Sequence, residues 1–465
     1  MTEFDRVAYL PVVSLSSVDV AHLLLALMVI LVLAHAGGQL FVRLRQPRVA
    51  GEIAGGLLLG PTVFASLAPQ AQYAVFHQGA VTEPVLGALY QLGLFLLMFC
   101  SGAALRSGVA AGERKTTTVI AAVGNLVPFA AGLLFLLALK PDNLIGAAHN
   151  QTAFMLVFSC AIAVTSVPVI AKIMADLGIL GTQFARIVLA VAVFEDVVLF
   201  VVVSVALGIV QPAGAQAFSL AGVFGVRAGT AASATYYVLA SAAFFSLPLV
   251  LGRGFMQRVA SQRWNILASS SPVAFQLLFV LAVTSLAIVL GVAAYFGAFV
   301  AGILAGRLDG VHERSHIAIK SFSFSVFIPI YFAIVGLQLD LLRHFDVLFF
   351  IVFLAYACAA KAASVYAAAR LTGQGPRAAR NLAVALNARG GPAIVLASVT
   401  YSARIINESF YVSLIMLALV TSMIAGAWLD AVLRNRRAGD DLLAGAETEQ
   451  PSAPAAKEGP IGVHA

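Results

Sequence analysis

The feature that most constrains this chain is a series of apolar runs, each about twenty residues long. A helix needs about 20 consecutive apolar residues to cross the hydrocarbon core of a bilayer. Of the 465 residues, 61% are hydrophobic and only 11% are charged, which is too little charge to cover the surface of a soluble protein of this length. The sequence therefore predicts an all-α polytopic membrane protein. It excludes a soluble enzyme, and no enzymatic activity is expected.

Thirteen hydrophobic segments can be counted along the chain. They lie near residues 19–42, 50–68, 84–104, 117–139, 152–175, 183–210, 233–252, 272–290, 292–306, 316–338, 346–369, 379–401 and 410–433. We predict a transmembrane domain over residues 1–437. Residues 438–465, rich in Ala, Pro, Gly and Glu, are predicted to be a disordered cytoplasmic tail.

The basic residues give the orientation of these segments. One alternating set of loops holds twenty Lys and Arg residues, whereas the opposite set holds five. Cytoplasmic loops carry the excess of positive charge, so we predict an inner-membrane protein with its N-terminus outside and its C-terminus in the cytoplasm. The net charge of +7 is then a signal of topology, and no nucleic-acid partner is needed to explain it.

Two pairs of similar stretches suggest an internal repeat. Gly56 to Gly60 resembles Gly302 to Gly306, and residues 94–102 resemble residues 329–336. A unit of six helices returns the chain to its starting side, and one further helix carries it across. We therefore predict that residues 19–210 and 272–433 are inverted repeats joined by a linker helix over 233–252, an arrangement typical of transporters.

Only four ionisable residues lie in the middle of a hydrophobic segment. They are Glu195, Asp196, Lys361 and Arg389. Each costs roughly 2.5–3.5 kcal/mol to insert, so such residues indicate function by default. Two acids and two bases form a formally neutral set, as expected of groups that compensate one another.

Two segments are also interrupted at their centres. Thr165 to Pro168 interrupts one, and Asn387 to Pro392 interrupts the other. Proline removes a backbone donor and paired glycines weaken a helix, which leaves free carbonyl groups. At membrane depth such groups persist only where they line a cavity or bind an ion. The breaks occupy the fifth helix of each predicted repeat, which points to a site near the midplane.

The adjacent acids suggest the chemistry of that site. Two neighbouring carboxylates in an apolar setting do not both ionise freely. A carboxylate that titrates near neutral pH holds either a proton or a small cation, and this competition is the core of cation:proton exchange. The alternative is structural, with a Glu195–Lys361 salt bridge that merely fastens two helices together.

At this point the chain resembles the monovalent cation:proton antiporter superfamily, in the branch that holds the Nap-type sodium exchangers and the Kef-type potassium systems. The resemblance rests on Gln46 to Pro61, residues 92–99, Thr165 to Pro168 followed by residues 177–180, the acid pair, residues 327–332 with Gly336, Lys361, and Asn387 to Gly390. It implies a thirteen-helix fold with two crossed broken helices, a dimerisation domain and a mobile core domain. It also implies a homodimer and an elevator-type alternating-access mechanism.

In that family the second acid of the pair carries the ion and the proton, which here is Asp196. The first acid is usually Asp or Asn, so Glu195 is a departure that leaves the stoichiometry open; its expected partner is Lys361. We therefore predict that Asp196, Glu195, Thr165 and Ser166 bind the ion and the proton, with Na+ or K+ at Asp196, supported by Lys361, Arg389, Asn387 and Pro168. The expected partners are the monovalent cation, the proton and the lipid bilayer, with no cofactor.

Three other functions are compatible with parts of the pattern. A sodium-coupled organic anion symporter shares the crossed-helix plan but needs a substrate vestibule. An intramembrane aspartyl protease needs two aspartates on facing helices, whereas only Asp196 lies in mid-membrane. A membrane sensor without transport leaves the repeat and the matched breaks unexplained.

Overall fold

Helices make up almost all of the structure, because a chain without water around it must satisfy its backbone hydrogen bonds within each segment. The computed structural model describes residues 16–77, 81–103, 113–139, 142–210, 220–223, 231–251, 255–262, 265–306 and 311–435. Within these residues the only β-pairing is an isolated bridge between Ile145 and Ile406. The predicted tail over 438–465 lies outside the described residues.

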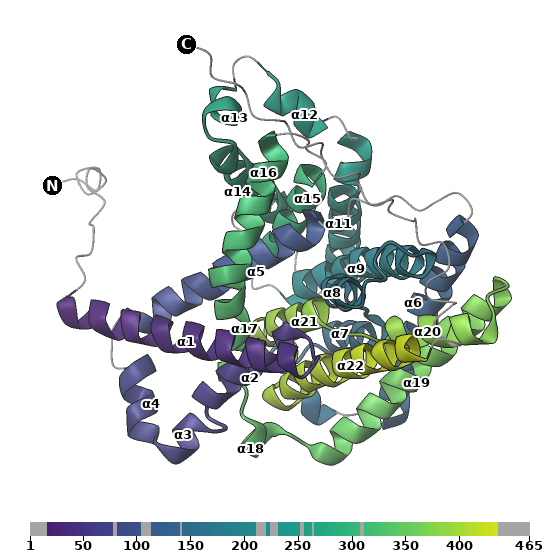
Figure 1. Cartoon of the computed structure of the whole chain (residues 1–465), viewed down its shortest axis with the longest axis horizontal. Coiled ribbons are helices and arrows are strands. Elements are labelled where there is room, and N and C mark those ends of the chain that lie inside the picture. Colours follow the sequence, from purple (N-terminus) through teal and green to yellow (C-terminus); the bar gives the residue numbers. More distant parts are fainter. Residues whose placement is uncertain are drawn as a thin grey trace, which may run out of the picture.

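The helices follow the predicted segments closely (Figure 1). The first half contains α1 (Ser17–Arg43), α2 (Arg48–Leu59), α3 (Phe64–Leu67), α4 (Pro69–Phe76), α5 (Thr82–Ala103), α6 (Arg114–Leu139), the short η3 (Asp142–Leu144), α7 (Gln151–Ala163), α8 (Val167–Asp176), α9 (Gln183–Val210) and α10 (Leu220–Val223). The second half contains α11 (Ala231–Leu251), α12 (Phe255–Ala260), α13 (Ile266–Ser270), α14 (Pro272–Val289), α15 (Ala294–Ala305), α16 (Val311–Phe322), the π-helical η5 (Ser323–Phe327), α17 (Ile328–Leu337), α18 (Leu341–His344), α19 (Val347–Leu371), α20 (Pro376–Ala385), α21 (Gly391–Ser402) and α22 (Glu408–Arg434).

Nine helical stretches in the described part of the chain are long and apolar enough to cross a membrane, and two of them, Arg48–Leu67 and Arg314–Leu337, each combine successive helices. Four shorter apolar helices accompany them, and two of these, α7 and α21, are halves of the segments that the sequence predicts to be broken. The chain is therefore a multi-pass α-helical membrane protein. The count of thirteen crossings remains a prediction.

One segment is shorter than predicted. The apolar run over 50–68 does not form a single helix, since α2 ends at Leu59 and Gly60 is extended. Pro61 follows and lacks the backbone N–H that a continuing helix would need. The chain resumes as the short helices α3 and α4.

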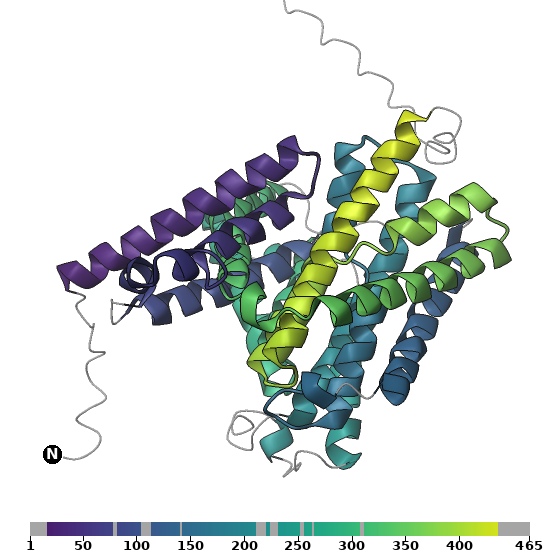
Figure 2. The same cartoon turned by 90° about the horizontal axis from the view of Figure 1, so that it is seen from below.

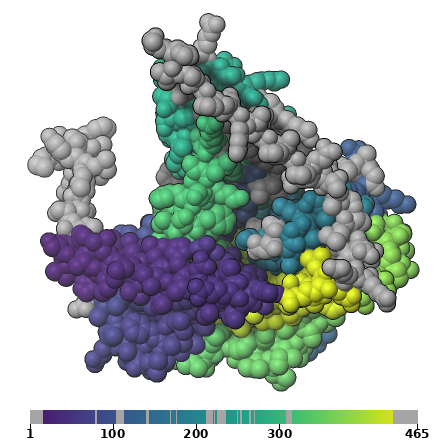
Figure 3. Space-filling view, in the orientation of Figure 1, coloured from purple at the N-terminus to yellow at the C-terminus, as the bar shows by residue number. Residues whose placement is uncertain are grey.

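The helices form two groups. The first contains α1, α2, α5, α14, α15 and α17, and the second contains α6 to α9 and α19 to α22, while α11 contacts α9 in one group and α15 in the other. In Figure 2, α1 and α2 lie on one side and α6, α19 and α20 on the other, with α22 between them. Figure 3 shows α1 lying along the surface, and its outward side chains include Leu24, Met28 and Val32, as expected of a helix that faces an apolar surrounding.

Glycines set the crossings within the first group. A Cβ atom on Gly56 of α2 would lie 1.9 Å from the carbonyl oxygen of Ala333 in α17, and one on Gly336 of α17 would lie 2.0 Å from a carbonyl oxygen of α2. Gly102 of α5 and Gly302 of α15 make the same kind of contact, each at 2.1 Å. In the predicted repeat α2 corresponds to α15 and α5 to α17, so the two crossings are equivalent. The inverted repeat itself remains a prediction.

We expect Gly56→Ala to lower the free energy of unfolding by about 2 kcal/mol or more. The added methyl group would clash with the backbone of α17, which cannot move aside as a side chain can by changing its rotamer. Thermal unfolding in detergent would measure the loss. Gly87→Ala is the matched control, since nothing lies within 4 Å of a Cβ atom at that position of α5. Equal stability of the two variants would contradict the close crossing.

Candidate functional site

The two interrupted segments meet at their breaks. Between α7 and α8, the backbone N–H of Ser166 donates to the carbonyl oxygen of Ala388 at 2.8 Å. The hydroxyl of Thr165 donates to the carbonyl oxygen of Leu386 at 2.5 Å. Both acceptors lie between α20 and α21, so the extended stretches cross and hydrogen-bond to each other.

Prolines and one glycine shape this crossing. Pro168 and Pro392 stand in the first turns of α8 and α21, where a missing N–H removes no helical hydrogen bond. The side chain of Pro168 lies outside the described part of the structure. A Cβ atom on Gly390 would lie 2.2 Å from the side chain of Val169, so only glycine allows the two breaks to approach this closely.

Arg389 binds the carbonyl groups that α7 leaves free at its end. Its side chain is fully buried. Its guanidinium group donates to the carbonyl oxygens of Ala161 at 3.3 Å and Ile162 at 2.8 Å, and to that of Ala357 in α19 at 3.0 Å. It also donates to the side-chain oxygen of Asn387 at 2.9 Å. A planar group with five donors suits such a set of acceptors, and its charge complements the negative end of the helix.

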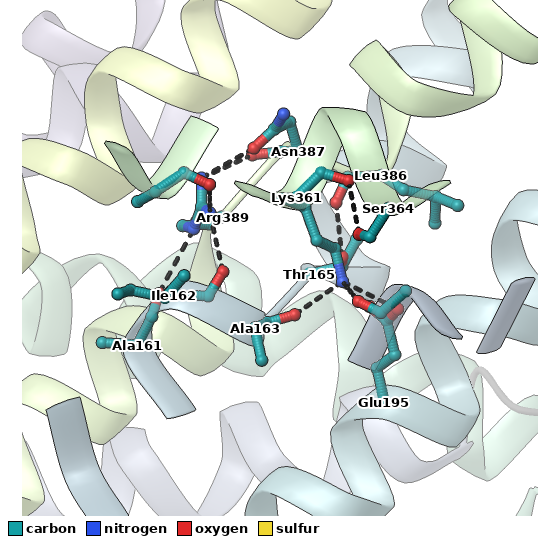
Figure 4. A network of polar contacts seen from close by, with 12 residues as sticks. Ala161, Ile162, Ala163, Thr165, Glu195, Lys361, Ser364, Leu386, Asn387 and Arg389 are labelled. Atoms are coloured by element: carbon teal, nitrogen blue, oxygen red, sulfur yellow. Dashed lines mark hydrogen bonds and ion pairs between the residues drawn. The ribbon is translucent and has the colours of Figure 1, made fainter. Parts of the chain in front are cut away.

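Lys361 of α19 completes the same helix end (Figure 4). Its Nζ atom lies 2.6 Å from the carbonyl oxygen of Ala163, 2.8 Å from that of Gly124 in α6, and 2.7 Å from Oε1 of Glu195. The ammonium group has three donors, and each has an acceptor. Lys361 and Glu195 thus form an ion pair whose side chains are both fully buried.

The carbonyl group of Gly124 is available because of a proline. Pro128 lies four residues further along α6 and has no N–H to donate to it. Lys361 takes the place of that missing donor. Gly124 was not among the predicted site residues, although a proline within a membrane helix leaves the carbonyl group four residues before it without its helical donor.

The two acids on α9 have different surroundings. Neighbouring residues of a helix point about 100° apart, so Glu195 and Asp196 face different sides. Oε1 of Glu195 is paired with Lys361, while its Oε2 has no hydrogen-bond partner among the described residues. Asp196 is also buried, and its Oδ1 has no partner within the same part of the chain. A small cavity lies beside Glu195 and is lined in part by Asn125 of α6 and Val164 at the break.

The structure brings most of the predicted residues into one network. Thr165, Glu195, Lys361, Asn387 and Arg389 all take part in it (Figure 4). Ser166 contributes its backbone to the crossing, and its hydroxyl accepts a hydrogen bond from the N–H of Val169 at 3.4 Å. The unpaired oxygens of Glu195 and Asp196 are hard oxygen ligands of the kind that bind either a proton or a small cation.

Comparison with known proteins agrees with this geometry. A sequence model for the transmembrane part of sodium/hydrogen exchangers matches residues 25–435. The chain is 26% identical to the Na(+)/H(+) antiporter NhaS4 of Synechocystis over 86% of its own length and 94% of that protein. It is 27% identical to cation/H(+) antiporter 20 of Arabidopsis thaliana, but spans only 47% of that longer protein. The solved structure of the sodium proton antiporter MjNhaP1 from Methanocaldococcus jannaschii has the same fold, with a TM-score of 0.62 at 14% identity over 91% of this chain and 99% of that one.

We expect Arg389→Met to destabilise the protein by about 3 kcal/mol or more, because it leaves several buried carbonyl groups without donors. Unfolding in detergent micelles would measure the change. Arg343→Met is the control, since that side chain is 83% exposed. A stability of Arg389→Met equal to that of the control would show that the guanidinium group does not hold the break.

Lys361→Met should cost about 3–5 kcal/mol of stability, because it leaves Glu195 buried without its charge partner. Adding Glu195→Gln should recover part of that loss, since the uncompensated charge is then removed. A double-mutant cycle of unfolding free energies would give the coupling, with the exposed Lys320→Met as a control. Additive effects of the two substitutions would contradict a mutual pair.

Proposed function

This chain belongs to the sodium/hydrogen exchanger family, and we propose that it exchanges a monovalent cation for protons across the membrane. Na+ is the preferred cation in this proposal and K+ the alternative. Among the curated relatives are proteins named as Na(+)/H(+) antiporter NhaS4, K(+)/H(+) antiporter 1 and Na(+)/H(+)-K(+) antiporter GerN. The similarity covers 94% of the length of NhaS4 and 92% of the length of GerN.

The proposal is based on the different surroundings of the two acids, Glu195 and Asp196. Lys361 satisfies one oxygen of Glu195, whereas Asp196 is buried and forms no ion pair among the described residues. A buried carboxylate without a fixed countercharge needs a mobile one. A proton and a monovalent cation each supply one positive charge, so either one neutralises Asp196. Binding of both at once would leave an excess positive charge and is disfavoured. We therefore assign Asp196 as the carrier and Glu195 as a supporting group that Lys361 holds in place.

We further propose that the second helix group moves relative to the first. The crossed breaks, both acids, Lys361 and Arg389 all belong to α7 to α9 and α19 to α22, so the site is contained within one group. The first group would then be the scaffold and dimerisation domain of a homodimer. A displacement of the second group along it would expose the site to each side in turn. This is the elevator-type mechanism that the sequence resemblance implies.

Asp196→Asn should abolish cation-driven proton flux, since an amide neither binds a proton at this site nor carries the charge that attracts a cation. Purified protein in liposomes, with a pH-sensitive dye inside and Na+ or K+ added outside in turn, would measure the flux without any organic solute. Asp346→Asn is the matched control, because Asp346 caps α19 and asparagine caps a helix equally well. Retained flux in Asp196→Asn would overturn the assignment of the carrier.

A further inference from the structure

The cavity beside Glu195 brings together polar groups from three parts of the chain. Glu195 lines it from α9, Asn125 from α6, and Val164 from the end of α7. The rest of its wall is apolar apart from the thiol of Cys160. Its volume of about 10 Å³ is close to the smallest space that holds one water molecule. The cavity is therefore too small for a hydrated ion or an organic solute.

One oxygen of Glu195 is left for this cavity. Lys361 donates to Oε1 at 2.7 Å, whereas Oε2 has no hydrogen-bond partner among the described residues. The hydroxyl of Thr165 also lies near Glu195 (Figure 4), but its single proton goes to the carbonyl oxygen of Leu386. No side chain of the described chain therefore supplies a donor to Oε2.

The other two polar groups on the cavity wall are unsatisfied as well. The carbonyl group of Val164 has no helical donor, because the residue four positions later is Pro168. The side chain of Asn125 is buried, and no hydrogen bond joins its amide group to another described residue. Buried polar groups without partners are costly, so a ligand that completes all three would stabilise this part of the site.

The surrounding charges decide which ligand fits. The groups near Glu195 that are charged or can titrate are Lys361 of α19, Arg389 at the second break, Asp196 on the same helix and the thiol of Cys160 on α7. Lys361 already compensates the charge of Glu195, and Lys361 and Arg389 are both fully buried. A metal cation at Oε2 would add a third positive charge beside them, and buried like charges repel strongly.

A water molecule avoids that repulsion and satisfies every group on the wall. It can donate one proton to Oε2 of Glu195 and the other to the carbonyl oxygen of Val164, while it accepts a hydrogen bond from the amide of Asn125. Three hydrogen bonds are the usual number for a buried water molecule.

We propose that this cavity is a binding site for one water molecule, and that Asn125 is a positioning residue that holds the water on Oε2 of Glu195. With Lys361 on one oxygen and the water on the other, Glu195 is stabilised as a carboxylate. The proton that is exchanged then goes to Asp196, which has no such donors in the described chain. The proposal rests on the exchange proposed above and explains how the two adjacent acids are kept in different roles.

Asn125→Leu tests the positioning role, because it nearly keeps the volume of the side chain and removes its polar group. Without the water, Glu195 should take up a proton at higher pH and then no longer pair with Lys361. We expect the pH of half-maximal flux in liposomes to move upward by about one unit, the equivalent of one hydrogen bond to a charged group. Asn125→Ser leaves a hydroxyl and room for the water, so it should restore the pH profile.

Asn143→Leu is the matched control, since it makes the same change at an exposed position of η3. Its pH profile should equal that of the unsubstituted protein. An unchanged profile in Asn125→Leu would overturn the positioning role.

Two measurements do not depend on transport. A high-resolution structure of the full chain should show one water molecule in contact with Glu195, Asn125 and Val164, and Asn125→Leu should remove it. Infrared spectra of Asp196→Asn, with and without Glu195→Gln, would isolate the carboxyl band of Glu195. Adding Asn125→Leu should convert that band from carboxylate to carboxylic acid at a pH where the parent shows the carboxylate.

Three results would overturn the water site. They are an anomalous signal of Tl+ beside Oε2 after soaking crystals, a direct hydrogen bond from Asn125 to Glu195, and a carboxyl band that Asn125→Leu leaves unchanged. The flux of the unsubstituted protein and its loss in Asp196→Asn test the exchange separately.

Discussion

The free carbonyl groups at the end of α7 are the constraint on which the rest of the site depends. A helix that stops inside the membrane has no water to satisfy its last carbonyls. Here Arg389 and Lys361 satisfy them, one from the opposing break and one from α19. Without these two cations the break in α7 would be unstable at this depth. The crossing, and the position of α9 beside it, would then lose their support.

This solution has an electrostatic consequence for the acids. Of the two buried cations, Lys361 is compensated by its ion pair with Glu195. Arg389 is held by carbonyl dipoles and by Asn387, with no carboxylate among its hydrogen-bond partners in the described chain. Asp196 therefore stands outside the network that holds the breaks. In our proposal Asp196 does not stabilise the breaks, so it can exchange a proton for a cation in every transport cycle without destabilising the site.

Much of this arrangement could be predicted from the sequence, because the signals are carried by side chains. The apolar runs located the helices, as in α9, whose bounds agree with the predicted segment over 183–210. The Pro and Gly residues of 165–168 and 387–392 located both breaks. Charged residues in mid-segment identified Glu195, Lys361 and Arg389, which the structure joins in one network.

What could not be predicted involves backbone partners and helix ends. The carbonyl groups of Ala161, Ile162 and Ala163 have no side-chain signature, so nothing in the sequence assigns them to Arg389 or Lys361. The end of α2 at Leu59 was missed because the apolar run continues past it, although Gly60 and Pro61 do mark a helix end in the sequence. The π-helical turn over Ser323–Phe327 likewise lies inside one predicted segment, and it contains no glycine or proline that would mark it.

The glycine crossings of the first helix group bear on how freely that group can change shape. Where α2 meets α17 and α5 meets α15, backbone lies directly against backbone. Such a contact contains no side-chain torsions, so it offers no alternative rotamers through which the helices could slide or tilt. The group has few internal degrees of freedom at its centre. We expect it to act as a rigid frame, so that any large displacement between the two groups would take place at their common boundary.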